Sequence, residues 1–110
     1  MNITTTLRDD GVAVLAVEGR INLVSAPDLR RAVQSVVDEG SARVAVDLSA
    51  VEFIDSSGLG ALISGLKTAR TAGGDLRLAA ATEQVTSVLQ LTNLDRILRV
   101  YPSPDDAYRD

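Results

Sequence analysis

The stretch EFIDSSGLGALI, residues 52–63, places an acid, two serines and two glycines between a large apolar pair and a segment with helical periodicity. A serine just before such a segment is a favoured N-cap, so Ser56 is predicted to cap a helix. Gly58 and Gly60 follow at once, although glycine inside a helix costs roughly 1 kcal/mol relative to alanine. A cap alone gains nothing from these glycines. We therefore expect them to leave the backbone open to a partner that approaches the Ser56 hydroxyl.

The residues on either side of this stretch predict a strand, a loop and a helix. Residues 44–48 form a short apolar run typical of a buried strand, and residues 49–56 are predicted to be a loop that Phe53 and Ile54 anchor in the core. The helix that follows has an apolar stripe and is predicted to end at Gly73-Gly74. The stripe consists of Leu59, Leu62, Ile63, Leu66 and Ala69.

The N-terminal part of the chain predicts a hairpin. Residues 3–7 alternate between apolar and polar types, as in a half-exposed strand, and residues 8–11 form a polar turn that ends in glycine. Residues 12–17 are a continuous apolar run, which is typical of a strand covered on both faces, and Gly19 is predicted to close it. The second strand of this hairpin is therefore expected in the middle of a sheet.

The remaining segments alternate between helix and strand patterns. Ser25, with Pro27 and Asp28 after it, predicts the capped start of a helix that ends at Gly40. Asn93 is expected at positive φ, where it would end a third helix. The other expected elements are a strand at residues 76–79, that third helix at residues 82–91, a last strand at residues 97–101 and a short terminal turn from Ser103.

Strands that alternate with helices predict a single α/β domain over residues 1–110, with a mostly parallel central sheet and one antiparallel edge strand from the hairpin. The carboxyl ends of parallel strands are where such sheets usually place function. Residues 20–25 and 49–56 are therefore the segments in which a site is expected.

Composition excludes several classes of function. The 110 residues include no cysteine and no histidine, which excludes disulfides, thiol chemistry, the usual zinc sites and a Ser-His-Asp triad. The net charge is −4 with cations scattered among acids, and only 3% of residues are aromatic, so we expect no direct nucleic-acid partner. The sequence shows no signal-peptide pattern and no run long enough to span a bilayer, so we expect a cytoplasmic protein without membrane insertion.

The motifs for enzyme chemistry are incomplete. Gly58-Leu59-Gly60 resembles the start of a dinucleotide fingerprint, but Ile63 occupies the third glycine position and no phosphate-binding loop occurs. A serine hydrolase would need Lys67, the only lysine, as its base. The acids Asp47, Glu52 and Asp55 are more often solvated or capping groups than cation ligands. We expect no catalytic residues, no metal and no cofactor, and we predict that the protein is not an enzyme.

The DSSGLG motif at residues 55–60, after the strand at residues 44–48, resembles the signature of the STAS family, and specifically of bacterial anti-sigma-factor antagonists. The resemblance covers nearly the whole chain, because residues 19–26 resemble the family's second-strand loop and first helix start. Residues 91–95 resemble its third helix end. The resemblance implies a STAS-like domain with about four helices packed mainly on one face of the sheet.

The resemblance also implies a mechanism. In that family the unphosphorylated antagonist binds an anti-sigma factor, which is also a serine kinase of the GHKL type, and so releases a sigma factor. The kinase phosphorylates the serine that corresponds to Ser56, and a PP2C-type phosphatase reverses the reaction. The residues that would contact the partner are Asn22, Asp55, Ser57, Gly58 and Gly60.

The chain departs from the family at Asn22, where antagonists usually carry an aspartate, and asparagine keeps the size of that side chain but loses its charge. An alternative within the same fold is a STAS scaffold or interaction subunit that does not switch, as in a stress-signalling assembly or a lipid-transport complex. In that case Ser56 would serve only as a cap or an interface residue.

Overall fold

The computed structural model describes residues 1–109 and contains five strands and three α-helices within them. In chain order the elements are β1 (Asn2–Leu7), β2 (Val12–Ile21), α1 (Ala26–Asp38), β3 (Arg43–Ile54), α2 (Ser56–Thr71), β4 (Asp75–Ala79), α3 (Glu83–Leu91), the 3-10 helix η1 (Leu94–Arg96) and β5 (Val100–Tyr101). The predicted α/β class is confirmed, although about four helices were expected.

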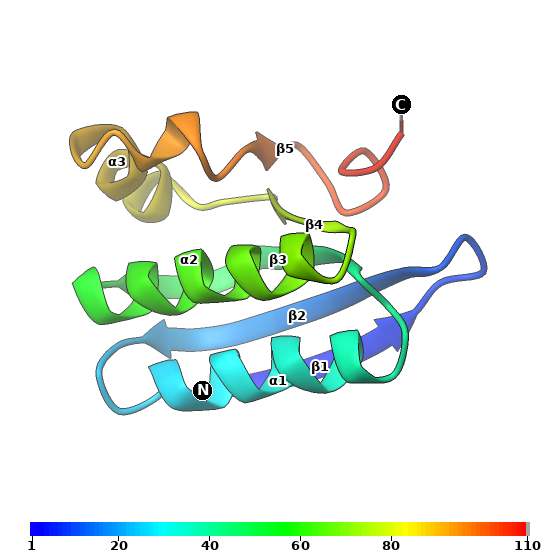
Figure 1. The fold of residues 1–110 in the computed structure, drawn as a ribbon. Helices are drawn as coiled ribbons and strands as arrows, with labels where there is room; N and C mark the ends of the chain where they lie inside the picture. Colours follow the sequence, from blue (N-terminus) through cyan, green and yellow to red (C-terminus); the bar gives the residue numbers. More distant parts are fainter. Residues whose placement is uncertain (110) are drawn as a thin grey trace.

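The strands form one five-stranded sheet in the order β1-β2-β3-β4-β5 (Figure 1). The pair β1–β2 is antiparallel, and the three pairs from β2 to β5 are parallel. This arrangement confirms the predicted hairpin and the mostly parallel sheet. The helices predicted between the later strands supply the crossover connections that parallel neighbours need. β2 lies inside the sheet, as its apolar run predicted.

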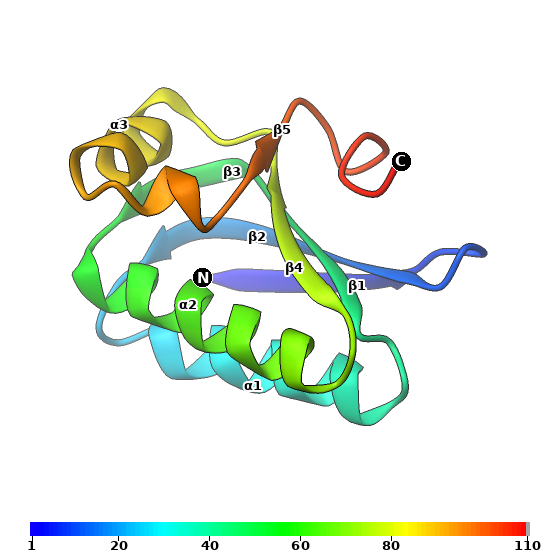
Figure 2. The ribbon, with the colours of Figure 1, turned by 45° about the horizontal axis from the view of Figure 1, so that its top comes forward.

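One face of the sheet carries the main core. Figure 2 shows α1 and α2 side by side against this face, and α3 lies near the end of β3. Alternate residues of the three longest parallel strands point into the core because side chains alternate across a strand. The strand residues buried there include Ala13, Leu15, Val17, Val44, Val46, Leu48, Leu76 and Leu78, and the helices add Leu29, Val33, Leu62, Leu66, Val85 and Leu89.

Two strands are longer than predicted, which changes the expected loops. β2 continues past Gly19, where φ is +101° and the pairing with β3 shifts register, so this glycine forms a bulge and does not close the strand. β3 continues to Ile54, because Ala50, Val51, Phe53 and Ile54 still pair with β2. The prediction that residues 49–56 form a loop is therefore wrong for all of them but Asp55, because β3 ends at Ile54 and α2 begins at Ser56.

The elements after β4 have the predicted types, but β5 is shorter than predicted. Asn93 has φ +60° and ends α3, as predicted. The expected strand at residues 97–101 is reduced to Val100 and Tyr101, because η1 and the turn after it occupy the residues before them. Residues 103–108 form turns, as expected. Within residues 1–109 no helix combines the length and the apolar character needed to cross a membrane.

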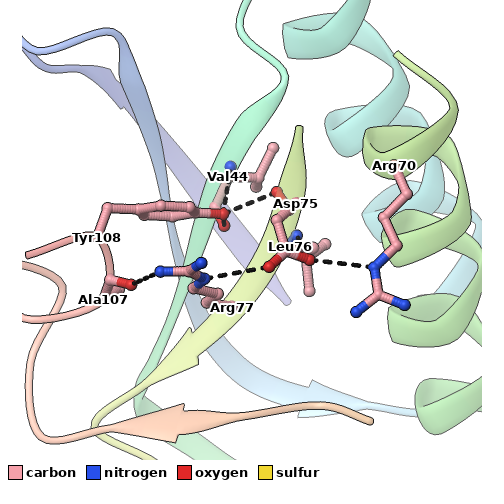
Figure 3. Close-up of polar contacts among 7 residues, drawn as sticks. All are labelled: Val44, Arg70, Asp75, Leu76, Arg77, Ala107 and Tyr108. Atoms are coloured by element: carbon pink, nitrogen blue, oxygen red, sulfur yellow. Dashed lines mark hydrogen bonds and ion pairs between the residues drawn. The ribbon is translucent and has the colours of Figure 1, made fainter. Parts of the chain in front are cut away.

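Tyr108 attaches the C-terminal segment to the starts of β3 and β4 (Figure 3). Its hydroxyl accepts a hydrogen bond from the Val44 N–H at 3.0 Å and lies 2.7 Å from the carbonyl oxygens of Val44 and Asp75, one of which accepts its proton. Burial raises the pKa of this hydroxyl well above its ordinary value, and the negative charge of Asp75 raises it further.

We predict that Tyr108→Phe lowers the free energy of unfolding by about 1–3 kcal/mol, because the Val44 N–H loses its partner. A pKa that is higher in the folded state contributes stability below the pKa of the unfolded tyrosine, near 10, and that contribution is lost as the pH rises above it. Urea denaturation between pH 7 and 11 should show this alkaline loss in the wild type and a smaller one in the variant.

Tyr101→Phe is the matched control, because the Tyr101 hydroxyl makes no hydrogen bond within residues 1–109. An equal loss of stability in the two variants would contradict the role assigned to Tyr108.

Candidate functional site

The candidate site lies at the edge where β2 and β3 both end. Ile21 pairs with Ile54 in the last register position of the two strands, and the Asp55 N–H donates to the Ile21 carbonyl at 3.2 Å. The loop after β2 and the start of α2 are therefore neighbours. This is the edge at which parallel sheets usually place function.

The N-cap of α2 is Asp55, not Ser56. Asp55 has an extended backbone (φ −114°, ψ −172°), and its carboxylate accepts the Gly58 N–H at 3.0 Å. Ser56 is already the first helical residue and is exposed, while Ser57 is half-buried. The prediction that Ser56 caps the helix is wrong because only a residue with non-helical φ and ψ can turn its side chain back onto the free N–H groups.

The Ser56 hydroxyl is therefore not used as the helix cap. The structure gives this hydroxyl no hydrogen-bond partner among residues 1–109. The free N–H groups and the positive end of the α2 dipole lie beside it. A small donor and acceptor group in this position can be modified or contacted without breaking an existing interaction.

Gly58 has a packing role that the sequence did not reveal. Gly58 is buried, and a Cβ atom at this position would lie 2.5 Å from the Ile21 carbonyl oxygen and 2.6 Å from Cγ1 of Ile54. Only glycine lets the first turn of α2 approach the ends of β2 and β3 so closely. The interpretation of Gly58 as open backbone is therefore corrected, because the side of the residue that would carry a side chain faces the protein.

Gly60 lies in more open surroundings. The nearest atom to a Cβ built there is Nη2 of Arg30 at 3.7 Å, which is an ordinary contact. Gly60 is four residues after Ser56, so both residues lie on the same face of α2, and Arg30 reaches this face from α1. The sequence does not indicate Arg30 as part of this face, because no pattern within one helix shows which neighbouring helix its charged side will contact.

Asn22 organises the loop between β2 and α1. Its side-chain oxygen accepts the N–H groups of Val24 and Ser25, both at 3.1 Å. The Ser25 hydroxyl accepts the Asn22 N–H at 2.9 Å and donates to the Arg20 carbonyl at 2.8 Å. Ser25 therefore closes this loop and makes no cap hydrogen bond to α1, contrary to the prediction.

Leu23 and Val24 form an exposed apolar pair on the same loop. Their relative exposures are 73% and 86%, although apolar side chains of this size usually gain by burial. The sequence signal for them was two adjacent large apolar residues in a segment already expected to be a loop. Together with Asn22 and the start of α2, they give this edge a mixed polar and apolar surface.

Arg20 and Phe53 contact each other at this edge through their side chains. The Arg20 guanidinium lies 4.4 Å from the centre of the Phe53 ring, in cation–π geometry. Phe53 is half-buried and does not belong to the core, which corrects the prediction that it anchors the stretch there, whereas Ile54 is fully buried as expected. The two differ because successive residues of a strand point to opposite faces.

The acidic residues of the region act as local acceptors. Asp55 caps α2, and the Asp47 carboxylate accepts the Ser49 N–H at 3.0 Å. No group of three or more acidic residues within residues 1–109 is arranged to hold a metal ion. Both contacts agree with the expectation that these acids are solvated or accept nearby N–H groups.

Comparison with known proteins assigns the family. Residues 4–107 match the model of the STAS domain. This chain belongs to the STAS domain family. RsfB of Mycobacterium tuberculosis, an anti-sigma-F factor antagonist, is 36% identical over 109 residues, which cover 96% of this chain and 87% of RsfB.

Solved structures of STAS proteins share this fold. The crystal structure of an anti-sigma factor antagonist from Mycobacterium paratuberculosis has a TM-score of 0.80 at 37% identity and covers 96% of this chain and 91% of its own. The antagonist SpoIIAA has been solved unphosphorylated, with a TM-score of 0.81 at 16% identity over 96% of this chain and 92% of its own. Its phosphorylated form, from Bacillus, has a TM-score of 0.73 at 15% identity over 96% of both chains. The likeness to SpoIIAA shows the fold alone.

The two glycines of the STAS motif should respond in opposite ways to alanine. Gly58→Ala should lower the free energy of unfolding by about 1–3 kcal/mol, because the methyl group overlaps the Ile21 carbonyl. Gly60→Ala should raise it by about 0.5–1 kcal/mol, because open space accepts the methyl group and alanine favours the helix. Urea denaturation of both variants measures the difference, and equal stabilities would contradict the assigned packing role.

Proposed function

We propose that this STAS domain is an anti-sigma factor antagonist whose unphosphorylated form binds an anti-sigma factor and thereby releases a sigma factor. RsfB and the protein from Mycobacterium paratuberculosis support the proposal, because both are named as anti-sigma factor antagonists and are 36% and 37% identical to this chain. In the proposed cycle the anti-sigma factor is also a GHKL-type serine kinase that phosphorylates Ser56. A PP2C-type phosphatase restores the free hydroxyl.

The observation that carries the proposal is the position of Ser56. It is exposed at the first residue of α2, and its hydroxyl has no partner among residues 1–109. The backbone beneath it is fixed by the Asp55 cap and by the close approach at Gly58. An acceptor serine needs this combination of an accessible side chain and a well-positioned backbone.

The proposed partner surface surrounds Ser56 at the edge where β2 and β3 end. It includes Asn22, Asp55, Ser57 and Gly60, as the family resemblance implies, and we add the exposed pair Leu23 and Val24. Apolar side chains at the centre of an interface supply area that is removed from water, while polar neighbours set orientation. Gly58 is buried, so its contribution is to hold the start of α2 in place for the partner.

Phosphorylation would act locally on this surface. A phosphate adds about −1.5 to −2 charges and three strong acceptors. The domain itself tolerates this charge, because the α2 N-terminus faces it and the Arg30 guanidinium lies near the same helix face. A partner packed on Ser56 would have to desolvate the phosphate beside Asp55, at a cost of several kcal/mol. The complex is therefore weakened while the fold is kept.

The proposal predicts that incubation with the anti-sigma kinase and ATP places one phosphate on Ser56, which mass spectrometry can locate. Ser56→Ala should remove the phosphate and bind the partner as the wild type does, with no loss of a cap because Asp55 caps the helix. Ser56→Asp should weaken binding at least tenfold in calorimetric titration, because a negative charge is buried in the interface.

Two variants serve as controls. Ser57→Ala tests the neighbouring serine and should leave phosphorylation in place, while Ser35→Asp adds the same charge at an exposed position of α1 and should leave binding unchanged. An unmodified wild type, together with full binding by Ser56→Asp, would overturn the switch. That result would favour a STAS scaffold that does not switch.

A further inference from the structure

A small basic pocket lies at the opposite end of α2 from Ser56. Its volume is about 280 Å³, and it lies where the last turn of α2 meets the start of β4 and the segment between η1 and β5. The lining residues are Arg70, Asp75, Leu76, Arg77, Arg96, Ile97 and Arg99. Four of the 11 cations of the chain therefore surround one concavity, although the net charge of the whole chain is −4.

Asp75, the single acid among the lining residues that the structure describes, is already shared between two of the arginines (Figure 3). Asp75 accepts Nε of Arg70 at 3.3 Å on one carboxylate oxygen and Nε of Arg77 at 3.1 Å on the other. The first of these oxygens also accepts the Leu76 N–H at 2.9 Å. Within residues 1–109 the lining side chains are four guanidinium groups and one carboxylate, with a formal charge of +3.

Several guanidinium groups of the pocket have N–H donors that make no hydrogen bond to a described residue. Arg70 uses only Nε, and its two Nη groups donate to no residue among 1–109. Arg96 and Arg99 are exposed and form no ion pair with any described residue. Like charges gathered in one hollow repel one another, and an anion between them would remove that repulsion.

Part of the pocket is held in place before any ligand arrives. The Arg77 guanidinium donates to the Ala107 carbonyl at 2.8 Å and lies 4.4 Å from the centre of the Tyr108 ring. Its side chain is only 18% exposed. Asp75 holds Arg70 against the same side of the pocket. Donors that are already oriented lose less freedom on binding.

We propose that this pocket binds a small phosphate-bearing molecule, with inorganic phosphate or the phosphate group of a phosphorylated metabolite held between Arg70, Arg96 and Arg99. Guanidinium groups match phosphate oxygens with paired N–H donors, and a phosphate carries enough charge to offset more than one of them. The volume is at the lower limit of ligand pockets, which suits one phosphate group with a small substituent. Ile97, which is 46% exposed, offers that substituent an apolar contact.

The pocket is separate from the proposed partner surface. Arg70 follows Ser56 by 14 residues on α2, which at 1.5 Å per residue is about 21 Å along the helix. Substitutions in the pocket therefore test this proposal without touching the residues around Ser56.

Binding is measured by amide chemical shifts in titrations with four probes: inorganic phosphate, pyrophosphate, a nucleoside 5′-monophosphate and the same nucleoside without phosphate. The phosphate-bearing probes should shift the amide signals of Leu76 and Ile97, and the nucleoside alone should not. Tighter binding of the monophosphate than of inorganic phosphate assigns a metabolite, and equal binding assigns free phosphate.

The double variant Arg96→Gln/Arg99→Gln should weaken binding at least tenfold, because it removes two positive charges and their charge-assisted hydrogen bonds to the phosphate. Arg31→Gln/Arg109→Gln is the matched control, since it removes the same charge from exposed arginines outside the pocket. The control should bind as the wild type does. Absence of binding by every phosphate-bearing probe, or equal weakening in the two double variants, would overturn the proposal.

Discussion

At the start of α2 the chain passes so close to the ends of β2 and β3 that residue 58 has no room for a methyl group. A Cβ atom there would lie 2.5 Å from the Ile21 carbonyl oxygen, which is well inside van der Waals contact. The same carbonyl accepts the Asp55 N–H, and the Asp55 carboxylate accepts the N–H of Gly58. These interactions fix the first turn of α2 against the sheet, so the position of Ser56 follows from the packing of buried backbone and not from its own side chain.

The loop after β2 depends on the same packing. Ile21 is its last strand residue, and Asn22 then uses its side-chain oxygen to order the residues that lead into α1. An aspartate would offer an equivalent oxygen to these two N–H groups, so Asn22 preserves the loop while it removes a charge from the surface. The conformation of this loop therefore does not depend on whether residue 22 is charged. The charge would matter only for binding of the proposed partner.

The α/β class, the antiparallel edge strand and the apolar faces of the helices followed from the sequence, because periodicity reports which side of an element is buried. The motif residues lie at the edge where β2 and β3 end, where a site was expected, and their role in binding a partner stays a prediction. The sequence could not show that Asp55 caps α2 in place of Ser56, since either residue type caps well and only backbone geometry decides. It could not show why Gly58 is a glycine, because its neighbours Ile21 and Ile54 come from other elements. The pocket of arginines was equally hidden, as Arg70 and Arg99 are distant in sequence.

The Asp55 cap and the close packing at Gly58 fix the backbone of Ser56, so a phosphate on Ser56 is expected to change the surface and leave the fold unchanged. The most direct test compares the backbone amide chemical shifts of the unmodified domain with those of the domain phosphorylated at Ser56. We predict chemical-shift changes confined to residues 22–25, residues 55–60 and the neighbouring part of α1 around Arg30. Large changes that spread through β4 and β5, which carry none of the residues of the proposed partner surface, would contradict it.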